Sequence, residues 1–233
     1  MSDDTHPPRD IDPDAIEAGR WLFAQQCRFI AGAADARSLP PETLPEIAFI
    51  GRSNVGKSSL VNTLTGRRML ARISDTPGRT RQINFFELGG RMILVDLPGY
   101  GYAAASKAAI AAWTALARNY LRGRSSLRRA CLLIDARHGI KETDRPLLRL
   151  CDEAALSYQV VLTKADKLGP AELAANAEAV AGELARHGAA HPEIHLTSAQ
   201  SGHGIASLRA ALAAFAEAGE AGARAMELPR QAR

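Results

Sequence analysis

The residues best suited to chemistry lie in the segment AFIGRSNVGKSSLVNTL, which contains the pattern Gly-x-x-x-x-Gly-Lys-Ser from Gly51 to Ser58. Gly51 and Gly56 allow a tight turn in which successive backbone N–H groups point at phosphate oxygens. Lys57 supplies a full charge for the β- and γ-phosphates, and the Ser58 hydroxyl is the expected Mg²⁺ ligand. An apolar run precedes the pattern and a helical segment follows it. The sequence therefore predicts a phosphate-binding loop (P-loop).

A second motif indicates the base of the nucleotide. The sequence Leu-Thr-Lys-Ala-Asp ends at Asp166, directly after an apolar Val-Val pair. A carboxylate at the end of a strand can accept hydrogen bonds from N1–H and the 2-amino group of guanine, whereas adenine offers neither donor. We therefore expect Asp166 to select guanine and the aliphatic part of Lys164 to cover the ring. The segment from Thr197 to Ala199 follows the next strand and can offer a backbone N–H to guanine O6.

The remaining candidates concern Mg²⁺ and the γ-phosphate. Asp96 ends the apolar run ILVD, and we expect it to hold Mg²⁺ through water, while the N–H of Gly99 senses the γ-phosphate. Thr80 lies in a long segment rich in turn residues and is the best candidate for a second hydroxyl ligand to Mg²⁺. Thr76 is the alternative in the same loop. Such a ligand would order the loop only when the γ-phosphate is present.

The elements that must position these residues follow a regular order. Helical segments at 57–66, 106–121, 141–154, 169–188 and 204–218 alternate with short apolar strands at 46–51, 128–136, 158–166 and 192–199. Gly89 and Gly90 join two further strands into a hairpin. This order predicts one α/β domain with a mostly parallel six-stranded sheet, helices on both faces and one antiparallel edge strand. The motifs all follow strands, at the edge where such sheets bind ligands.

The termini and the composition add weaker expectations. We expect a disordered acidic arm at 1–12, a helical extension at 13–44 with a helix from Pro13 to about Arg37, a core domain at 45–218 and a flexible tail at 219–233. There is no signal-peptide or membrane-span pattern, and the three cysteines match no metal or redox spacing, so we expect a cytoplasmic protein with reduced thiols. The net charge of +4 fits either an ordinary cytosolic protein or one that contacts RNA.

The segments GRSNVGKSSL, PGRT, INFF, DLPGYGYA, TKAD and TSA resemble, in that order, the EngB family of bacterial ribosome-biogenesis GTPases. The resemblance spans about residues 46–215 and implies a single Ras-like P-loop GTPase domain. It also implies binding of GTP or GDP with Mg²⁺, slow hydrolysis, a part in assembling the large ribosomal subunit, and a link to cell division and septation. The protein would act as a monomer, without a membrane partner, on a precursor particle of rRNA and ribosomal proteins.

The resemblance also implies which residues contact GTP. They are Gly51, Arg52, Ser53, Asn54, Val55, Gly56, Lys57, Ser58, Gly78, Arg79, Thr80, Arg81, Gln82, Asp96, Leu97, Pro98, Gly99, Thr163, Lys164, Ala165, Asp166, Thr197, Ser198 and Ala199. Mg²⁺ would rest on Ser58 and Thr80. Thr163 stands where many other GTPases have Asn, which leaves one loop-bracing hydrogen bond without its usual donor.

Four residues are candidates for a direct part in hydrolysis: Lys57, Thr80, Gly99 and Asn54. Many GTPases place a water-orienting Gln directly after Asp-x-x-Gly, but this chain has Tyr100 there. A phenol is poorly placed for that task, so we expect intrinsic turnover near the roughly 10⁻⁴ s⁻¹ of an unassisted GTPase. The Asn54 carbonyl either helps to hold K⁺ against the phosphates or only braces the loop.

Three readings of function remain open on the sequence alone. The first is a GTPase switch that controls docking on a ribosomal precursor. The second is an RNA- or protein-binding module in which the nucleotide is structural and hydrolysis is insignificant. The third is an ATP-dependent small-molecule kinase, which Asp166 argues against. The basic run containing Arg118, Arg122, Arg124, Arg128 and Arg129 is either a solvated face or an rRNA contact.

Overall fold

The computed structural model describes residues 12–67, 82–100 and 107–227. In this part of the chain seven strands form one sheet in the order β1-β3-β4-β2-β5-β6-β7. Strand β2 (Glu46–Gly51) is parallel to β4 (Met92–Asp96) and β5 (Leu127–Asp135). Strands β6 (Tyr158–Thr163) and β7 (His195–Leu196) continue the parallel part. The predicted α/β fold with a mostly parallel sheet is confirmed, with one strand more than the six expected.

The extra strand replaces part of the predicted N-terminal helix. Helix α1 (Pro13–Ala24) begins at Asp12, whose side chain accepts a hydrogen bond from the N–H of Asp14, and the prediction that it continues to about Arg37 is wrong. Residues 27–33 instead form β1 (Cys27–Ala33), antiparallel to β3 (Ile83–Leu88). Pairing satisfies the exposed backbone edge of β3, and Phe29 packs edge-on against Phe86 at 5.7 Å between ring centres. The edge strand is therefore β1, and the predicted edge strand β3 lies inside the sheet.

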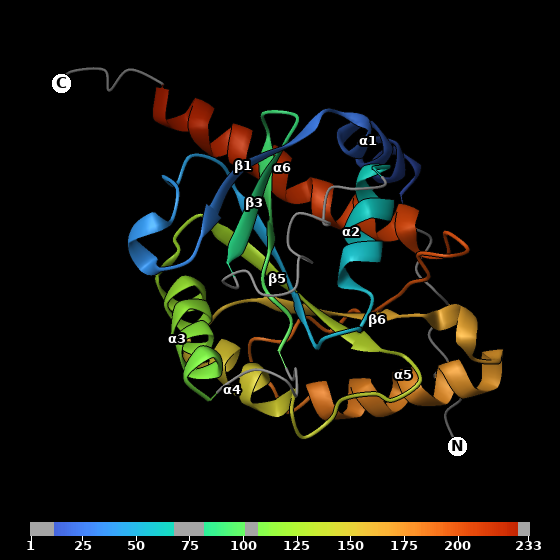
Figure 1. The fold of residues 1–233 in the computed structure, drawn as a ribbon. Helices are drawn as coiled ribbons and strands as arrows, with labels where there is room; N and C mark the ends of the chain where they lie inside the picture. The colour runs from blue at the N-terminus through green and yellow to red at the C-terminus, as the bar shows by residue number, and fades with distance from the viewer. Residues whose placement is uncertain (1–11, 68–81, 101–106, 228–233) are drawn as a thin grey trace.

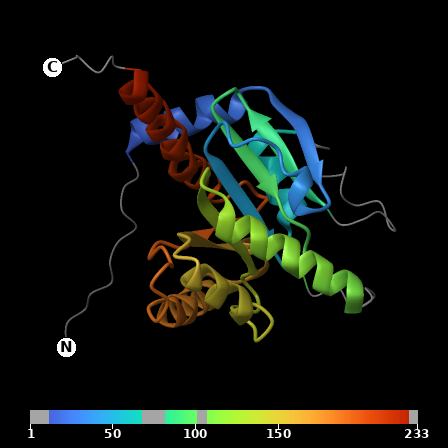
Figure 2. The same ribbon diagram turned by 90° about the vertical axis from the view of Figure 1, so that its left-hand side faces the viewer.

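Helices cover both faces of the sheet. One apolar core joins the sheet to α1, α2 (Lys57–Thr65) and α6 (Ile205–Glu227), and a second joins it to α3 (Lys107–Gly123), α4 (Arg145–Glu153) and α5 (Pro170–Leu184). Figures 1 and 2 both show α1 (blue) lying against α6 (red), and Figure 2 shows α3 (green) running along the sheet. A Cβ at Gly19 of α1 would lie 2.6 Å from the amide nitrogen of Ala210 in α6, so only glycine permits this close crossing.

The end of the last helix differs from the sequence prediction, and the hairpin between β3 and β4 agrees with it. The predicted flexible tail is wrong in its first part, because α6 continues to Glu227 through an Ala- and Glu-rich segment of high helix propensity. The predicted hairpin is confirmed, since Gly89 and Gly90 turn between β3 and β4 with φ values of 60° and 68°. None of the described helices is both long enough and apolar enough to span a membrane.

Candidate nucleotide-binding site

The predicted P-loop connects the end of β2 to the start of α2, as its mechanism requires. Gly56 precedes the helix with φ 104°, and Asn54 also has a positive φ of 63°. A Cβ at Gly51 would lie 2.9 Å from the carbonyl oxygen of Leu133. The loop therefore leaves the sheet where the backbones of β2 and β5 are too close for a side chain. The turn that aims N–H groups toward a phosphate is therefore present at residues 51–58.

The end of β6 holds the P-loop from one side. The Thr163 hydroxyl donates to the carbonyl oxygen of Val55 at 2.6 Å and lies 3.2 Å from that of Ile134. Lys164 has φ 59°, and its Nζ donates to the carbonyl oxygen of Asn54 at 2.7 Å. Thr163 thus supplies the bracing bond that was in doubt without Asn at this position. The base motif and the P-loop form one hydrogen-bonded unit.

Lys57 and Asp96 meet at the centre of the site. The Lys57 ammonium forms an ion pair with Oδ1 of Asp96, and both side chains are nearly buried, at 10% and 2% exposed. Asp96 ends β4, beside the first turn of α2 that carries Ser58. A buried carboxylate and a serine hydroxyl are the hard oxygen donors that Mg²⁺ prefers, so these residues fit the implied metal.

A cavity of about 810 Å³ lies beyond the P-loop, against α2 and the ends of β6 and β7. Asp166 lies on its wall, in a short 3₁₀ helix formed by Ala165–Lys167. The Ser198 hydroxyl donates to Asp166 Oδ1 at 2.6 Å, and Lys167 Nζ lies 3.1 Å from Oδ2. These two contacts lower the pKa of Asp166. Its carboxylate is therefore ionised and held in place, ready to accept hydrogen bonds from a ligand in the cavity.

The segment Thr197 to Ala199 closes the same end of the cavity. Thr197 accepts a 3.0 Å hydrogen bond from the N–H of Ala165, which fixes the two loops together. The Ser198 side chain is fully buried, and its hydroxyl oxygen also accepts from the N–H groups of Gln200 and Ser201. Sequence reasoning expected only a backbone donor here. The role of Ser198 in holding Asp166 was missed, because nothing in the short motif Thr-Ser-Ala indicates it.

The segment after Asp96 runs alongside the P-loop. The N–H of Leu97 donates to Phe49 O at 3.0 Å, and Tyr100 exchanges two backbone hydrogen bonds with the loop, from its N–H to Gly51 O at 3.2 Å and from Ser53 N–H to its own carbonyl at 2.8 Å. A Cβ at Gly99 would lie 3.1 Å from Ser53 N. The peptide of Gly99 is thus pressed against the P-loop, close to where a γ-phosphate would be sensed.

The side chain of Tyr100 points elsewhere. Its hydroxyl donates to Asp144 Oδ1 at 2.8 Å, and Asp144 immediately precedes α4. Burial and the neighbouring Asp144 raise the pKa of the phenol far above its ordinary value, so it stays protonated and donates. Sequence reasoning missed Asp144, which only the contact across 44 positions reveals.

Part of the predicted site lies outside the described residues. This applies to Thr76, Gly78, Arg79, Thr80 and Arg81, so the predicted switch ligand Thr80 stays a prediction. Gln82 is described and packs against β1, where a Cβ at Gly32 would lie 2.8 Å from its side-chain carbon Cδ. Pro98 is described as half-buried between Leu97 and Gly99.

The basic run at 118–129 does not form one charged face. Arg124 is only 5% exposed and is held by the fully buried Glu46 at 2.6 Å and by Pro40 O at 2.7 Å. Arg129 lies 5.0 Å over the Phe215 ring, and Arg122 pairs with Glu153 at 2.5 Å. Arg124 therefore fits neither interpretation of the run, the solvated face or the rRNA contact, because it is a buried structural residue. Arg118 and Arg128 are the exposed ones without such partners among the described residues.

The three thiols Cys27, Cys131 and Cys151 are free and buried. Burial raises the pKa of Cys27 to about 11 and that of the other two to about 12. At neutral pH they are therefore protonated packing residues, as the sequence predicted.

Two family models and many curated proteins match this chain in sequence. The sequence model of a family described as 50S ribosome-binding GTPase matches residues 46–164, and that of the elongation factor Tu GTP-binding domain matches residues 116–218. A probable GTP-binding protein EngB of Rhodospirillum rubrum is 59% identical over 87% of this chain and 90% of its own length. A relative with the same description from Rhodopseudomonas palustris strain TIE-1 is 54% identical over 87% and 94%.

Solved structures share the fold. The crystal structure of a probable GTP-binding protein engB superposes with a TM-score of 0.59 at 24% identity, covering 74% of this chain and 99% of its own. Era in complex with MgGDPNP and nucleotides 1506–1542 of 16S ribosomal RNA gives 0.56 at 24% identity, covering 75% and 57%. Sequence identity to the two relatives is far above 30% over most of both chains. The chain belongs to the EngB family of GTP-binding proteins.

Proposed function

We propose that this protein is a slow GTP-hydrolysing switch whose GTP-bound state controls docking on a precursor of the large ribosomal subunit. One observation carries the nucleotide part of the proposal. Asp166 lies on the wall of the 810 Å³ cavity, three residues after Thr163, which is bonded to the P-loop. This bond fixes the distance between the carboxylate that would recognise guanine and the loop that would hold the phosphates.

The residues of the P-loop would divide the work between binding and charge stabilisation. Backbone N–H groups of residues 54–58 would hold the phosphates, and Lys57 would turn from Asp96 toward the β- and γ-phosphates. Ser58 and Thr80 would hold Mg²⁺ directly and Asp96 through water. When bound, Mg²⁺ neutralises negative charge on the phosphate oxygens. Gly99 would donate its N–H to the γ-phosphate and so couple the following segment to the nucleotide state.

Slow intrinsic turnover follows from Tyr100. The position that orients the attacking water in many GTPases carries a phenol bonded to Asp144. Hydrolysis would then depend on an outside activator such as the ribosomal particle. The same observation favours the alternative function, a nucleotide-stabilised RNA- or ribosome-binding module without significant hydrolysis.

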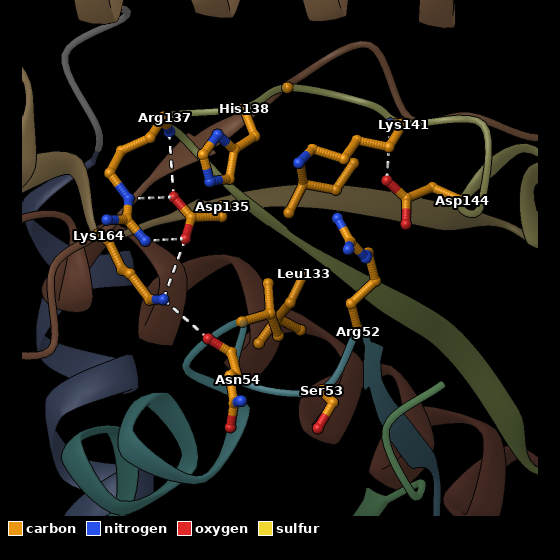
Figure 3. A pocket seen from close by; sticks show the side chains of 13 residues that line it. Arg52, Ser53, Asn54, Leu133, Asp135, Arg137, His138, Lys141, Asp144 and Lys164 are labelled. Atoms are coloured by element: carbon orange, nitrogen blue, oxygen red, sulfur yellow. Dashed lines mark hydrogen bonds and ion pairs between the residues drawn. The ribbon is translucent and has the colours of Figure 1, made fainter. Parts of the chain in front are cut away.

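Asn54 is proposed to support hydrolysis through a monovalent cation. Its carbonyl oxygen is already taken by Lys164 Nζ, while its side-chain amide has no partner among the described residues and points away from Lys164 (Figure 3). That amide oxygen is available to hold K⁺ against the phosphates. Hydrolysis measured in KCl and in NaCl tests this role. Equal rates in the two salts would leave Asn54 as a loop-bracing residue only.

The ribosomal part of the proposal is supported by kinship. The family whose model matches residues 46–164 is described as 50S ribosome-binding GTPase. We propose further that the protein acts in the cytoplasm as a monomer and that it is linked to normal cell division and septation.

Two measurements test the proposal. Calorimetry with Mg²⁺ should give binding of GDP and GTP but not ATP. Sedimentation of cell extract with added purified protein should then place the protein on large-subunit precursors with a non-hydrolysable GTP analogue and release it with GDP. Equal particle binding with both nucleotides would support the binding-module alternative, and no difference between GTP and ATP would contradict the nucleotide assignment.

A further inference from the structure

A second cavity, of about 230 Å³, lies on the outer side of the P-loop (Figure 3). Its floor is the segment from Arg52 to Val55, and its walls are the end of β5 and the loop that leads into α4. Lys57, Ser58, Asp96 and Asp166 do not line it, whereas residues 52–55 and Lys164, also expected to contact GTP, do. The cavity is therefore separate from the proposed nucleotide site and shares with it only the P-loop and Lys164.

The two carboxylates of this cavity are already engaged. Asp135 accepts from the Arg137 guanidinium at 2.7 and 2.9 Å and lies 3.0 Å from Lys164 Nζ. Asp144 accepts from the Tyr100 hydroxyl with one oxygen and from the backbone N–H of Lys141 with the other, each at 2.8 Å. The charge of Asp135 is thus matched by two cations, whereas Asp144 is held by neutral donors and keeps its negative charge in the cavity.

Two basic side chains of the same cavity, those of Arg52 and Lys141, have no such partner among the described residues. The Nε of Arg52 is completely buried without a hydrogen bond, and across residues 12–67, 82–100 and 107–227 neither its guanidinium nor the Lys141 ammonium forms an ion pair. Figure 3 shows Arg52 extending from the P-loop toward Lys141, while the His138 ring lies nearer to Arg137 and Asp135. The lining carries four cationic side chains, Arg52, Arg137, Lys141 and Lys164, against two carboxylates, so two positive charges are left over in one small space. An anion between Arg52 and Lys141 would reduce their mutual repulsion.

We propose that this cavity is a second anion site that binds a phosphate group. Arginine offers a planar pair of donors and lysine a point charge, the combination that suits a phosphate with several oxygens. At about 30 Å³ for each water in the liquid, the cavity holds a five-atom oxyanion and some of its hydration. Because Arg52 belongs to the P-loop, the bound phosphate would contact the same loop that grips the nucleotide, but from its opposite side.

The phosphate has two possible sources with the same chemistry: inorganic phosphate or a small phosphorylated molecule, and a phosphodiester of an RNA backbone. The P-loop itself binds phosphate, so the nucleotide site must first be saturated with GDP and Mg²⁺. That loading is measured separately, so a failure of GDP binding is seen apart from a failure of this cavity. If GDP does not bind, the titration below is run on the nucleotide-free chain, and the dependence on Lys141 decides which site responds.

The test is an NMR titration of the ¹⁵N-labelled GDP-loaded chain with inorganic phosphate. Saturable shifts are expected at Gly139, Lys141 and the His138 ring, and Lys141→Gln should weaken the affinity at least tenfold, as expected for the loss of one charged hydrogen bond. Lys141→Arg keeps the charge and should retain binding. Arg149→Gln, which removes an equal charge from an exposed position of α4, should leave it unchanged.

A second titration uses a short single-stranded RNA and its methylphosphonate counterpart, which lacks the backbone charge. Displacement of phosphate by RNA but not by the uncharged analogue would assign the site to an RNA backbone. Phosphate binding without displacement by RNA would assign it to a small phosphorylated ligand. Absence of saturable shifts at the cavity, or equal affinity for the protein and its Lys141→Gln variant, would overturn the proposal.

Discussion

The hydroxyl of Tyr100 donates a 2.8 Å hydrogen bond to Oδ1 of Asp144, across a sequence separation of 44 residues. This bond ties the residue after Asp-x-x-Gly to the start of α4 rather than to the nucleotide. We therefore expect Tyr100→Phe to change intrinsic GTP hydrolysis by less than about threefold, because the phenol takes no part in the reaction. A single-turnover assay measures this directly.

The same substitution should lower the free energy of unfolding by about 1.5–3 kcal/mol, the usual contribution of a hydrogen bond to a charged group such as the Asp144 carboxylate. Tyr158→Phe is the matched control, since the Tyr158 hydroxyl is buried without a partner among the described residues. Removal of the Tyr158 hydroxyl should leave the free energy of unfolding, measured by urea titration, unchanged. A hydrolysis rate reduced tenfold or more in Tyr100→Phe would show that the phenol reaches the nucleotide after all.

Asp166→Asn should convert guanine preference into xanthine preference. The NH₂ group of the amide is a donor where the carboxylate oxygen was an acceptor. It would face the 2-amino group of guanine, which is also a donor, whereas xanthine has a carbonyl oxygen at that position. We expect GTP affinity to fall by about 10³-fold or more and XTP to bind in its place. Calorimetry with both nucleotides measures this, and Glu172→Gln on the exposed start of α5 is the control.

Ser198→Ala tests whether Asp166 is held rather than merely present. Loss of the 2.6 Å hydrogen bond would leave the carboxylate in the cavity but free to move, so we expect a GTP affinity about tenfold weaker with unchanged preference for guanine. Unchanged affinity would mean that Lys167 alone positions the carboxylate.

The ion pair between Lys57 and Asp96 should stabilise the nucleotide-free protein. Asp96→Asn leaves a lysine that is 10% exposed without its ion-pair partner, so we expect unfolding to require about 3 kcal/mol less. The double variant Lys57→Met/Asp96→Asn removes both charges and should recover most of that loss. Urea titrations without nucleotide and with excess EDTA give the coupling free energy between the Lys57 and Asp96 side chains. Purely additive losses would contradict a direct ion pair in solution.

Sequence patterns predicted where the candidate site residues lie in the fold, but not the bonds that hold them. The P-loop residues and Asp166 were proposed because phosphate and guanine chemistry need particular groups at strand ends, and the structure places them after β2 and β6. The bonds that hold these groups were not predictable, because they join distant residues: Thr163 to Val55, Tyr100 to Asp144, and Ser198 to Asp166.

The main error at the level of the fold has the same origin. The spacing of Trp21, Phe23, Phe29 and Ile30 fits a helix locally, but the free edge of β3 takes residues 27–33 as a strand. Local periodicity carries no information about such an edge. The basic run was likewise misjudged as one surface, because sequence alone does not reveal that Arg124 reaches the buried Glu46.

Asp135 should make stability depend on pH in the acid range. Burial opposes its ionisation, but hydrogen bonds from Arg137 and Lys164 outweigh this and hold the pKa of the carboxyl well below its ordinary value of 3.8. A lowered folded-state pKa stabilises the protein above the unfolded-state pKa, and this contribution is lost as pH falls below about 4. The difference in unfolding free energy between the protein and Asp135→Asn should therefore be largest at neutral pH. A difference that stays constant from pH 7 to pH 3 would contradict this.

Arg124 and Arg128 should separate structural from binding roles within the basic run. Arg124 forms a forked pair with Glu46 at the foot of β2, where Tyr120 donates to the same carboxylate at 2.8 Å. Removing it by Arg124→Ala leaves a buried carboxylate without its cation, so we expect a loss of about 3–5 kcal/mol. Arg128 is exposed, and Arg128→Ala should change stability by less than about 0.5 kcal/mol.

If the run contacts rRNA, the double variant Arg118→Ala/Arg128→Ala should weaken particle binding and flatten its salt dependence, because fewer phosphate contacts release fewer counter-ions. Unchanged binding and salt slope in this stable double variant would place the rRNA contact on another face.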